Sequence, residues 1–324
     1  MTEPRYDVIA IGNAIVDVMA PCEDALVERL GMQRGAMVLV DPQRAEKLYA
    51  AMPPAREISG GSAANTLAGL AALGARCAFI GQVAQDQLGE VFAHDIRAAG
   101  IAFDTPPRAG DPPTGRCLIF VSPDGQRTMN TCLGASQFLP STALDLRLVA
   151  DAAILYLEGY LWDPPEPRAA MRQAMEAARA AGRTIAFTLS DAFVIERHGG
   201  DFLALIEDGL IDILFANHIE LAALTGEADF EAGLAARRRR SHRDRGGNSR
   251  RRARRAGRAG GGHDRRGRPV RRRLPVRPCA GRGPADLPCY GRGGGGGDHR
   301  ALRRAAGGGL AGADGRAVRV AGCP

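Results

Sequence analysis

The sequence lacks any apolar run approaching the roughly 20 residues that a membrane-spanning helix needs, and no positively charged, then apolar leader opens it. Its seven cysteines are odd in number and scattered. They show neither the short paired spacing of a zinc site nor the density of a disulfide-rich secreted scaffold. We therefore expect a cytoplasmic protein with no membrane partner, whose cysteines are reduced thiols.

The last quarter of the chain lacks most of the residue types that build a core. Residues 237–324 contain no Ile, Phe, Met, Trp, Lys, Glu, Gln or Thr, but they contain 26 Arg and five Asp, a net charge of +21. Because the whole chain carries +7, the preceding 236 residues carry −14. This composition predicts a globular domain over 1–236 and a C-terminal part, 237–324, that is disordered or non-native. Such a tail would attract nucleic acid only non-specifically, through its charge.

Within residues 1–236, short apolar runs rich in β-branched residues alternate with longer helical segments. This alternation is typical of an α/β fold with a doubly wound, mainly parallel sheet. The predicted strands are Asp7–Ile11, Cys77–Ile80, Ile154–Leu157, Thr184–Thr188 and Ile211–Ala216. The predicted helices are Ala63–Leu73, Gln87–Ala99, Arg168–Ala181, Phe202–Asp208 and Ile219–Leu224.

A second pattern interrupts this alternation. Apolar and polar residues alternate singly in Met37–Val40, Arg116–Val121 and Arg127–Thr131. The last two segments flank Ser122-Pro123-Asp124-Gly125, in which Asp-Gly is a hairpin turn signal. We predict a small antiparallel β lid built from strands near 37–40 and 116–131, and a homodimer contact through this lid is a further expectation.

An amide and a carboxylate follow the first predicted strand closely. Asn13 and Asp17 come just after Ile11-Gly12, at the carboxyl end of a parallel strand, where such folds bind ligands. A carboxylate there can accept hydrogen bonds from two adjacent sugar hydroxyls. The alternative is that both side chains only satisfy turn and cap groups.

A glycine pair precedes the first predicted helix. Gly60 and Gly61 allow the backbone to approach a ligand closely, Ser62 is a candidate N-cap, and Asn65 can point from the first helical turn into the same pocket. Because glycine pairs before helices are common, this signal is weak by itself.

A second amide and carboxylate follow the strand Ile211–Ala216. Asn217 and Glu220, three residues apart on the first turn of a helix, face the same way and suit water-mediated holding of a Mg²⁺–phosphate group. The alternative is a capping arrangement, in which Asn217 caps the helix and Glu220 reaches back to it.

Taken together, the order and spacing of these motifs resemble the ribokinase-like (PfkB) family of carbohydrate and nucleoside kinases. Tyr156–Asp163 and Phe187–Asp191 are more similar to bacterial adenosine kinases than to ribokinases. The resemblance implies ATP and Mg²⁺ as cofactors and a small-molecule nucleoside or sugar as partner, with phosphate passing to the 5′-hydroxyl of adenosine or a related ribosyl compound. It also implies that Asn217 and Glu220 lie by the metal and phosphates, and that the sugar is bound by Asn13, Asp17, Gly60, Gly61 and Asn65.

Two alternatives stay open on the sequence. The first is a sugar kinase of the same family with a different pocket. The second is a non-catalytic chain that binds nucleic acid through its Arg-rich tail. The second is disfavoured because single-strand binders interleave aromatic residues for base stacking, and 237–324 has only Tyr290.

The resemblance also implies a Gly-x-Gly-Asp motif that opens a helix late in the chain and carries the catalytic base. We find no such helix-opening motif in this reading frame, so no catalytic residue is assigned. A GC-rich gene read out of register yields mainly Arg, Gly, Ala and Pro, as 237–324 shows. Codons for Gly262–Arg277 can be chosen so that the offset frame reads Asp-Thr-Thr-Gly-Ala-Gly-Asp. We therefore interpret the tail as frame-shifted, with the family's aspartate straddling the codons of Arg268 and Pro269.

Overall fold

A computed structural model describes residues 3–226, 309–311 and 317–321 of the chain. The predicted domain boundary at 236 and the segment Gly262–Arg277 lie outside the described residues. Among the residues that are described, no helix is long and apolar enough to cross a membrane. Four described cysteines, Cys22, Cys77, Cys117 and Cys132, are free thiols, as the sequence predicts.

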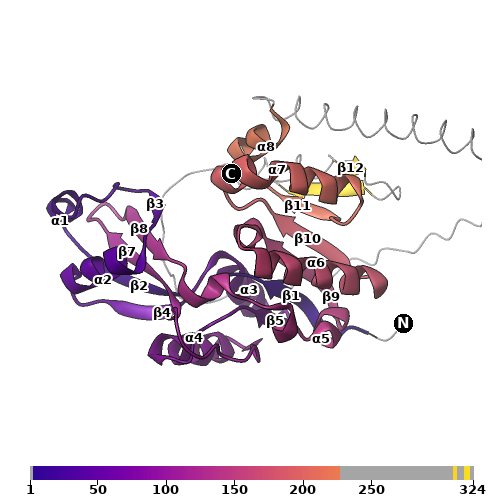
Figure 1. The fold of residues 1–324 in the computed structure, drawn as a ribbon, viewed down its shortest axis with the longest axis horizontal. Coiled ribbons are helices and arrows are strands. Elements are labelled where there is room, and N and C mark those ends of the chain that lie inside the picture. The colour runs from indigo at the N-terminus through magenta and orange to yellow at the C-terminus, as the bar shows by residue number, and fades with distance from the viewer. Residues whose placement is uncertain (1–2, 227–308, 312–316, 322–324) are drawn as a thin grey trace, which may run out of the picture. The chain divides into compact units, whose positions relative to one another are not determined.

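The larger of two sheets is mainly parallel, in the order β12-β13-β11-β10-β9-β1-β5-β6, and only the β12–β13 pair is antiparallel. Figure 1 labels β12, β11, β10, β9, β1 and β5 across this sheet. The five predicted strands of this sheet are confirmed, with small shifts at their ends. The bounds are β1 Tyr6–Ile11, β5 Cys77–Ile80, β6 Ile101–Ala102, β9 Ala152–Glu158, β10 Thr184–Thr188, β11 Ile213–Phe215, β12 Gly309–Ala311 and β13 Ala317–Ala321.

Helices cover both faces of this sheet, and strand β1 shows why. Ile9 and Ile11 pack into one core with helices α6 and α7, whereas Val8 and Ala10 pack into a second core with α3 and α4. Apolar residues on both sides of one strand require two covering layers, so the doubly wound prediction is confirmed. The helices are α3 Ser62–Ala72, α4 Gln87–Ala98, α5 Leu146–Ala150, α6 Pro165–Ala180, α7 Ala192–Glu207 and α8 His218–Thr225, with 3₁₀ turns at Gly134–Gln137, Ser141–Ala143 and Gly159–Trp162.

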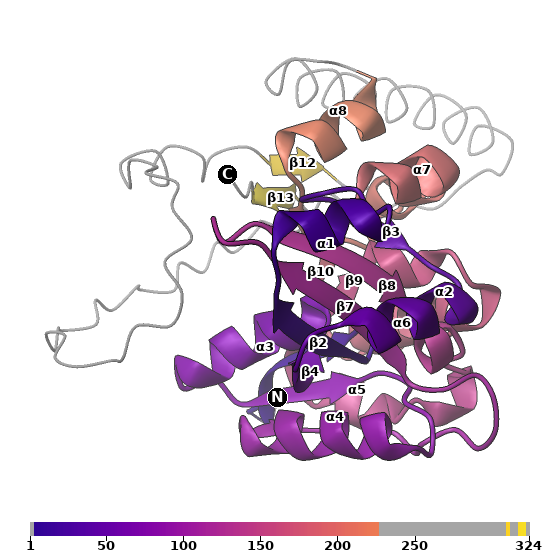
Figure 2. The same ribbon diagram turned by 90° about the vertical axis from the view of Figure 1, so that its left-hand side faces the viewer.

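The smaller sheet is the lid, with the strand order β3-β8-β7-β2-β4. The predicted hairpin is present. β7 and β8 pair antiparallel, and Val121 and Arg127 form the last pair before the turn between them. Helix α2 packs against β7 and β8, and Figure 2 shows α1 and α2 together with the lid strands. The bounds are β2 Ile15–Pro21, α1 Asp24–Arg29, β3 Met37–Leu39, α2 Pro42–Ala51, β4 Arg56–Gly60, β7 Gly115–Val121 and β8 Arg127–Cys132.

The expectation of an antiparallel lid needs correction, because the sheet is mixed. The pairs β2–β7 and β3–β8 are parallel. Each of these pairs is joined by a long connection, and a long connection is what parallel pairing requires. Sequence reasoning also missed β2 and β4, which pair antiparallel with each other.

Two short segments of the tail are strands in the structure. β13 pairs in parallel with β11, and β12 pairs with β13. Composition alone did not predict these strands. The run Ala317-Val318-Arg319-Val320-Ala321 has a local alternation of β-branched residues that favours a strand, and an average over 88 residues conceals it.

Candidate functional site

The candidate site lies where the sheet reverses its strand order. From β1 the chain continues to β5 on one side, and β9, β10 and β11 extend on the other. Ligands of doubly wound folds bind at the carboxyl ends of strands beside such a reversal. A cavity of about 410 Å³ lies at this edge and under the lid, a size within the range of small-molecule pockets.

Most of the predicted ligand-binding residues meet at this cavity. Asn13, Asp17, Gly61 and Asn65 line it. Gly60 does not line it but lies directly against the Asp17 carboxyl group. Asn217 and Glu220 are not among the residues that line it. The structure therefore brings together the residues predicted to hold a sugar and leaves the predicted phosphate residues outside this cavity.

The Asp17 carboxylate is the acidic group of the cavity with the strongest indication of a ligand contact. It lies on β2 in the lid, facing the cavity, and within the described part of the chain no group donates a hydrogen bond to its carboxylate. Burial raises the pKa of Asp17 to about 6, and the charge of Arg127 opposes this only partly. Asp17 is half-buried, and partial desolvation of a carboxylate without protein donors is unfavourable; the hydroxyls of a bound ligand would supply hydrogen bonds to it.

Both glycines of the pair are required by close contacts. A Cβ on Gly60 would lie 2.3 Å from the Asp17 Cγ, so only glycine leaves room for the carboxyl group. Gly61 has φ +96° and passes the Asn13 carbonyl so closely that a Cβ would lie 2.4 Å from that oxygen. The pairing of β2 with β4 places this turn beside Asp17. The sequence predicted that the two glycines let the backbone approach a ligand. In the structure, the groups that closely approach them are the Asp17 carboxyl group and the Asn13 carbonyl oxygen.

Asn13 is held by protein groups on both ends of its amide. Its side-chain Nδ2 donates to Glu158 Oε1 at 3.1 Å, and its Oδ1 accepts from Ser136 Oγ at 2.8 Å. Ser62, the expected N-cap, is instead the first residue of α3, and Gly61 takes the cap position without a side-chain bond. The Ser62 hydroxyl instead donates to Glu158 Oε2 at 2.8 Å.

Strands β2, β3, β7 and β8 of the lid each contribute one face to the cavity. Residues directly opposite one another form a row across the sheet, Asp17, Cys117, Thr131 and Leu39. All four line the cavity, as do Ile119 and Met129 in the neighbouring row. Because side chains alternate between the two faces of a strand, the lid presents to the cavity a mostly apolar surface that also carries the charged side chains of Asp17 and Arg127.

The side of the cavity opposite the lid combines aromatic and acidic groups. Tyr160 and Phe193 line it, with ring centroids 6.0 Å apart. Burial, together with the nearby charge of Asp191, raises the pKa of Tyr160 well above its usual range, so its hydroxyl stays protonated. The other acidic group, Asp163, is paired with His198 at 2.7 Å and with Arg197 at 2.5 Å.

Asn217 and Glu220 form the capping arrangement that was weighed as an alternative. Asn217 Oδ1 accepts from the Glu220 backbone N–H at 2.8 Å, and Glu220 Oε2 accepts from the Asn217 N–H at 3.2 Å. Asn217 Nδ2 also donates to Glu220 Oε1 at 2.8 Å. Both side chains are therefore engaged with each other. Among the described residues, no group of three or more His, Cys, Asp or Glu is placed to hold a metal ion, so we derive no step through one.

The fold and the site define a class: a ribokinase-like α/β protein, in which a β-sheet lid covers a small-molecule cavity at the strand-order reversal. Residues 37–243 match the model of the "pfkB family carbohydrate kinase". The chain belongs to this family.

Solved structures and curated relatives agree with this assignment. An adenosine kinase from Sinorhizobium meliloti is 51% identical, with a TM-score of 0.66, over 71% of this chain and 70% of that one. A probable sugar kinase from Rhizobium etli is 47% identical, with a TM-score of 0.67, over 72% and 70%. The guanosine-inosine kinase of Escherichia coli is 27% identical over 233 residues, 68% of this chain. The chain spans only 53% of the length of that relative.

Sequence reasoning did not assign Glu158, Ser136 or the cavity-lining aromatic residues to the site. A signal existed for Glu158, because it is a carboxylate at the end of the apolar run Ile154–Leu157, at the edge where ligands bind. The letters Gly-x-Gly-Asp do occur once, at Gly295–Asp298, within a run of five glycines. That segment lies outside the described residues, and only one large aliphatic side chain, Leu302, occurs in the ten residues after it.

Proposed function

We propose that the chain derives from an ATP- and Mg²⁺-dependent kinase that phosphorylates the 5′-hydroxyl of adenosine or a related nucleoside. The observation that carries this proposal is the half-buried Asp17 carboxylate, which has no donor among the described residues and lines a cavity of nucleoside size. Asp17 would accept two ribose hydroxyls, with Asn13, Gly61 and Asn65 beside it. The lid would exclude water from the reacting groups.

The walls of the cavity support a nucleoside over a free sugar. Ile119, Met129 and Tyr160 present apolar and aromatic surface, which a flat aromatic base covers more completely than a polyhydroxylated sugar does. A sugar kinase of the same family is the second candidate, supported by the probable sugar kinase at 47% identity. The base-sized apolar wall is our reason for preferring the nucleoside.

We propose further that this chain, as written, has lost catalysis because of the shift in reading frame. A positioned base contributes roughly 10²–10⁴ in rate and an anion hole roughly 10²–10³, and both belong to the motif that we read only in the offset frame. Asn217 and Glu220 would lie near the phosphates, with the nucleotide itself holding Mg²⁺. Because their side chains already bond each other, any contact with the ion would pass through its bound water.

Calorimetry and a phosphoryl-transfer assay test the two parts separately. We expect the chain to bind adenosine more tightly than free ribose, and we expect Asp17→Ala to abolish this binding. We expect turnover with ATP only after the gene is restored to register near codons 230–240. Failure to bind any nucleoside would contradict the substrate class. Robust turnover by the chain as written would contradict the loss of its base.

A further inference from the structure

Glu158 is the most completely buried carboxylate at the cavity, with 0% of its surface exposed. It stands at the end of β9, next to the end of β1 in the sheet. Four hydrogen bonds reach it, two on each oxygen. Oε1 accepts from the Asn13 backbone N–H at 2.5 Å and from Asn13 Nδ2 at 3.1 Å, and Oε2 accepts from Ser62 Oγ at 2.8 Å and from the Ala63 N–H at 3.0 Å.

These four bonds connect two segments that are far apart in the sequence. Asn13 belongs to the connection from β1 to β2, and Ser62 and Ala63 open helix α3. The segments approach so closely that a Cβ on Gly12 would lie 2.5 Å from the Ala63 Cβ and 3.0 Å from the Glu158 Cδ. Glu158 therefore sets the spacing between the two segments that carry the predicted sugar contacts.

The surroundings of Glu158 suit its ionised form, although burial acts against ionisation. Burial raises the pKa of Glu158 above its ordinary value, and the hydrogen bonds from Asn13, Ser62 and Ala63 offset this only in part. All four neighbours are donors, and one of them is a backbone N–H at the positive end of a helix. A neutral carboxyl group could direct its own O–H only at the Ser62 hydroxyl, because the other three neighbours are N–H groups that cannot accept. An ionised carboxylate offers about four acceptor positions, and here protein groups occupy four.

We propose that Glu158 is a positioning residue for sugar recognition, which holds Asn13 and the start of α3 at the separation that fits adjacent ribose hydroxyls. It does so without contacting the ligand, because its own acceptor positions are filled. This inference rests on the proposed function, since it requires that the cavity bind a ribosyl compound. It extends that function by assigning two different roles: Glu158 sets the geometry of the site, and Asp17 accepts hydrogen bonds from the sugar hydroxyls.

The test measures hydroxyl discrimination and not affinity alone. Binding of adenosine, 2′-deoxyadenosine and 3′-deoxyadenosine to the full chain is measured by calorimetry for the wild type and for Glu158→Gln. In Glu158→Gln, one carboxylate oxygen is replaced by an amide NH₂ group, which cannot accept the hydrogen bonds that this oxygen accepts in the wild type. A hydrogen bond to a charged group carries roughly a tenfold to hundredfold effect, so the wild type should prefer adenosine by at least about tenfold. Glu158→Gln should reduce that preference to within about threefold.

A matched control separates positioning from loss of stability. Phe92→Leu removes volume from an aromatic cluster with Phe79 and Phe103, and Phe92 does not line the cavity. It should lower the melting temperature and leave the preference for adenosine intact. Glu158→Asp keeps the charge but is one methylene shorter, so it should retain part of the preference. It carries the test if Glu158→Gln does not fold.

The outcomes are distinguishable. If the folded Glu158 variants discriminate among the three nucleosides as the wild type does, the positioning role is wrong and the proposed function stands. The positioning role is equally wrong if Phe92→Leu loses the preference to the same degree at the same loss of stability. If the wild type binds none of the three nucleosides, the proposed function fails, and this inference fails with it.

Discussion

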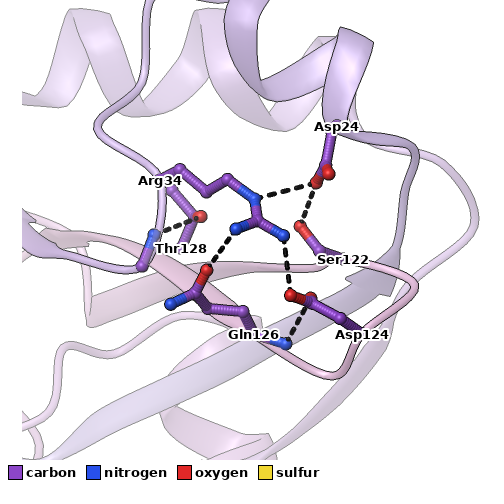
Figure 3. Close-up of polar contacts among 7 residues, drawn as sticks. Asp24, Arg34, Ser122, Asp124, Gln126 and Thr128 are labelled. Carbon is purple, nitrogen blue, oxygen red and sulfur yellow. Dashed lines mark hydrogen bonds and ion pairs between the residues drawn. The ribbon is translucent and has the colours of Figure 1, made fainter.

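Arg34 Nη2 lies 2.8 Å from Asp124 Oδ2 and ties the tip of the lid hairpin to the loop that precedes β3. The same guanidinium donates through Nε to Asp24 at 3.0 Å, and Nη1 donates to Gln126 Oε1 at 2.5 Å (Figure 3). One side chain thus connects helix α1, the hairpin and the start of β3. Because β3 carries Met37 and Leu39 over the cavity, this cluster affects how firmly the lid covers the site.

We predict that Arg34→Ala loosens the outer edge of the lid. Hydrogen exchange should become faster at the amides of Val40 and Met129, which bond between β8 and the β3 segment. High salt should produce part of the same effect in the wild type, because the ion pairs are exposed. Arg76→Ala, which breaks an exposed pair with Asp7 in the other sheet, is the control. Equal effects from both variants would contradict the prediction.

Asp17 should make stability depend on pH in a definite direction. Its pKa rises from 3.8 to about 6 on folding, so the folded state binds the proton more tightly than the unfolded state. Stability is therefore lost as pH rises from about 4 to 6, by at most ~3 kcal/mol. Asp17→Asn should stabilise the unliganded protein at pH 8 and change little near pH 4, as urea unfolding at both values would show. A stability gap independent of pH would contradict the assignment.

Nucleoside binding should show the opposite dependence on the same group. If the ionised Asp17 carboxylate accepts the ribose hydroxyls, affinity should fall as pH decreases through about 6, by roughly tenfold per unit well below that value. Asp17→Asn should bind weakly at every pH. Affinity that stays constant between pH 5 and 8 would show that the carboxylate does not bind the ligand in its ionised form.

Gly61→Ala should be strongly destabilising. Gly61 has a φ of +96°, which residues with side chains rarely adopt. A Cβ added to it would also lie only 2.4 Å from the Asn13 carbonyl oxygen. We expect a loss of more than ~2 kcal/mol in the free energy of unfolding. Gly182→Ala is the control, since Gly182 has φ +71° but open space around it, and it should cost only about 1–2 kcal/mol. Similar losses at both positions would show that the contact with Asn13 is unimportant.

Asn217 allows capping to be separated from a role near phosphate. Asn217→Ala should destabilise the protein by about 1 kcal/mol because α8 loses its cap, whereas Asn217→Ser should retain most of the stability. If Asn217 serves only as a cap, nucleotide affinity should follow stability across the two variants. A loss of ATP affinity in the stable Asn217→Ser variant would support the proposed position near the phosphates.

The amino-acid sequence by itself determined the repeating βα order, the lid hairpin and the change of composition at residue 237. These follow from local signals: apolar runs, the Asp-Gly turn and composition. It also predicted that Asn13, Asp17 and Asn65 share one pocket, which they line, because polar residues near strand ends and helix starts can be recognised in the sequence.

Only the tertiary structure decided how these pieces meet. The pairing of β2 with β4 brings Gly60 against Asp17, and the burial of Glu158 joins Asn13 to α3. β13 lies beside β11 although about a hundred residues separate them in the sequence. Pairing between distant strands and the burial of a single carboxylate arise from packing across the whole domain, and no local pattern of residues encodes either.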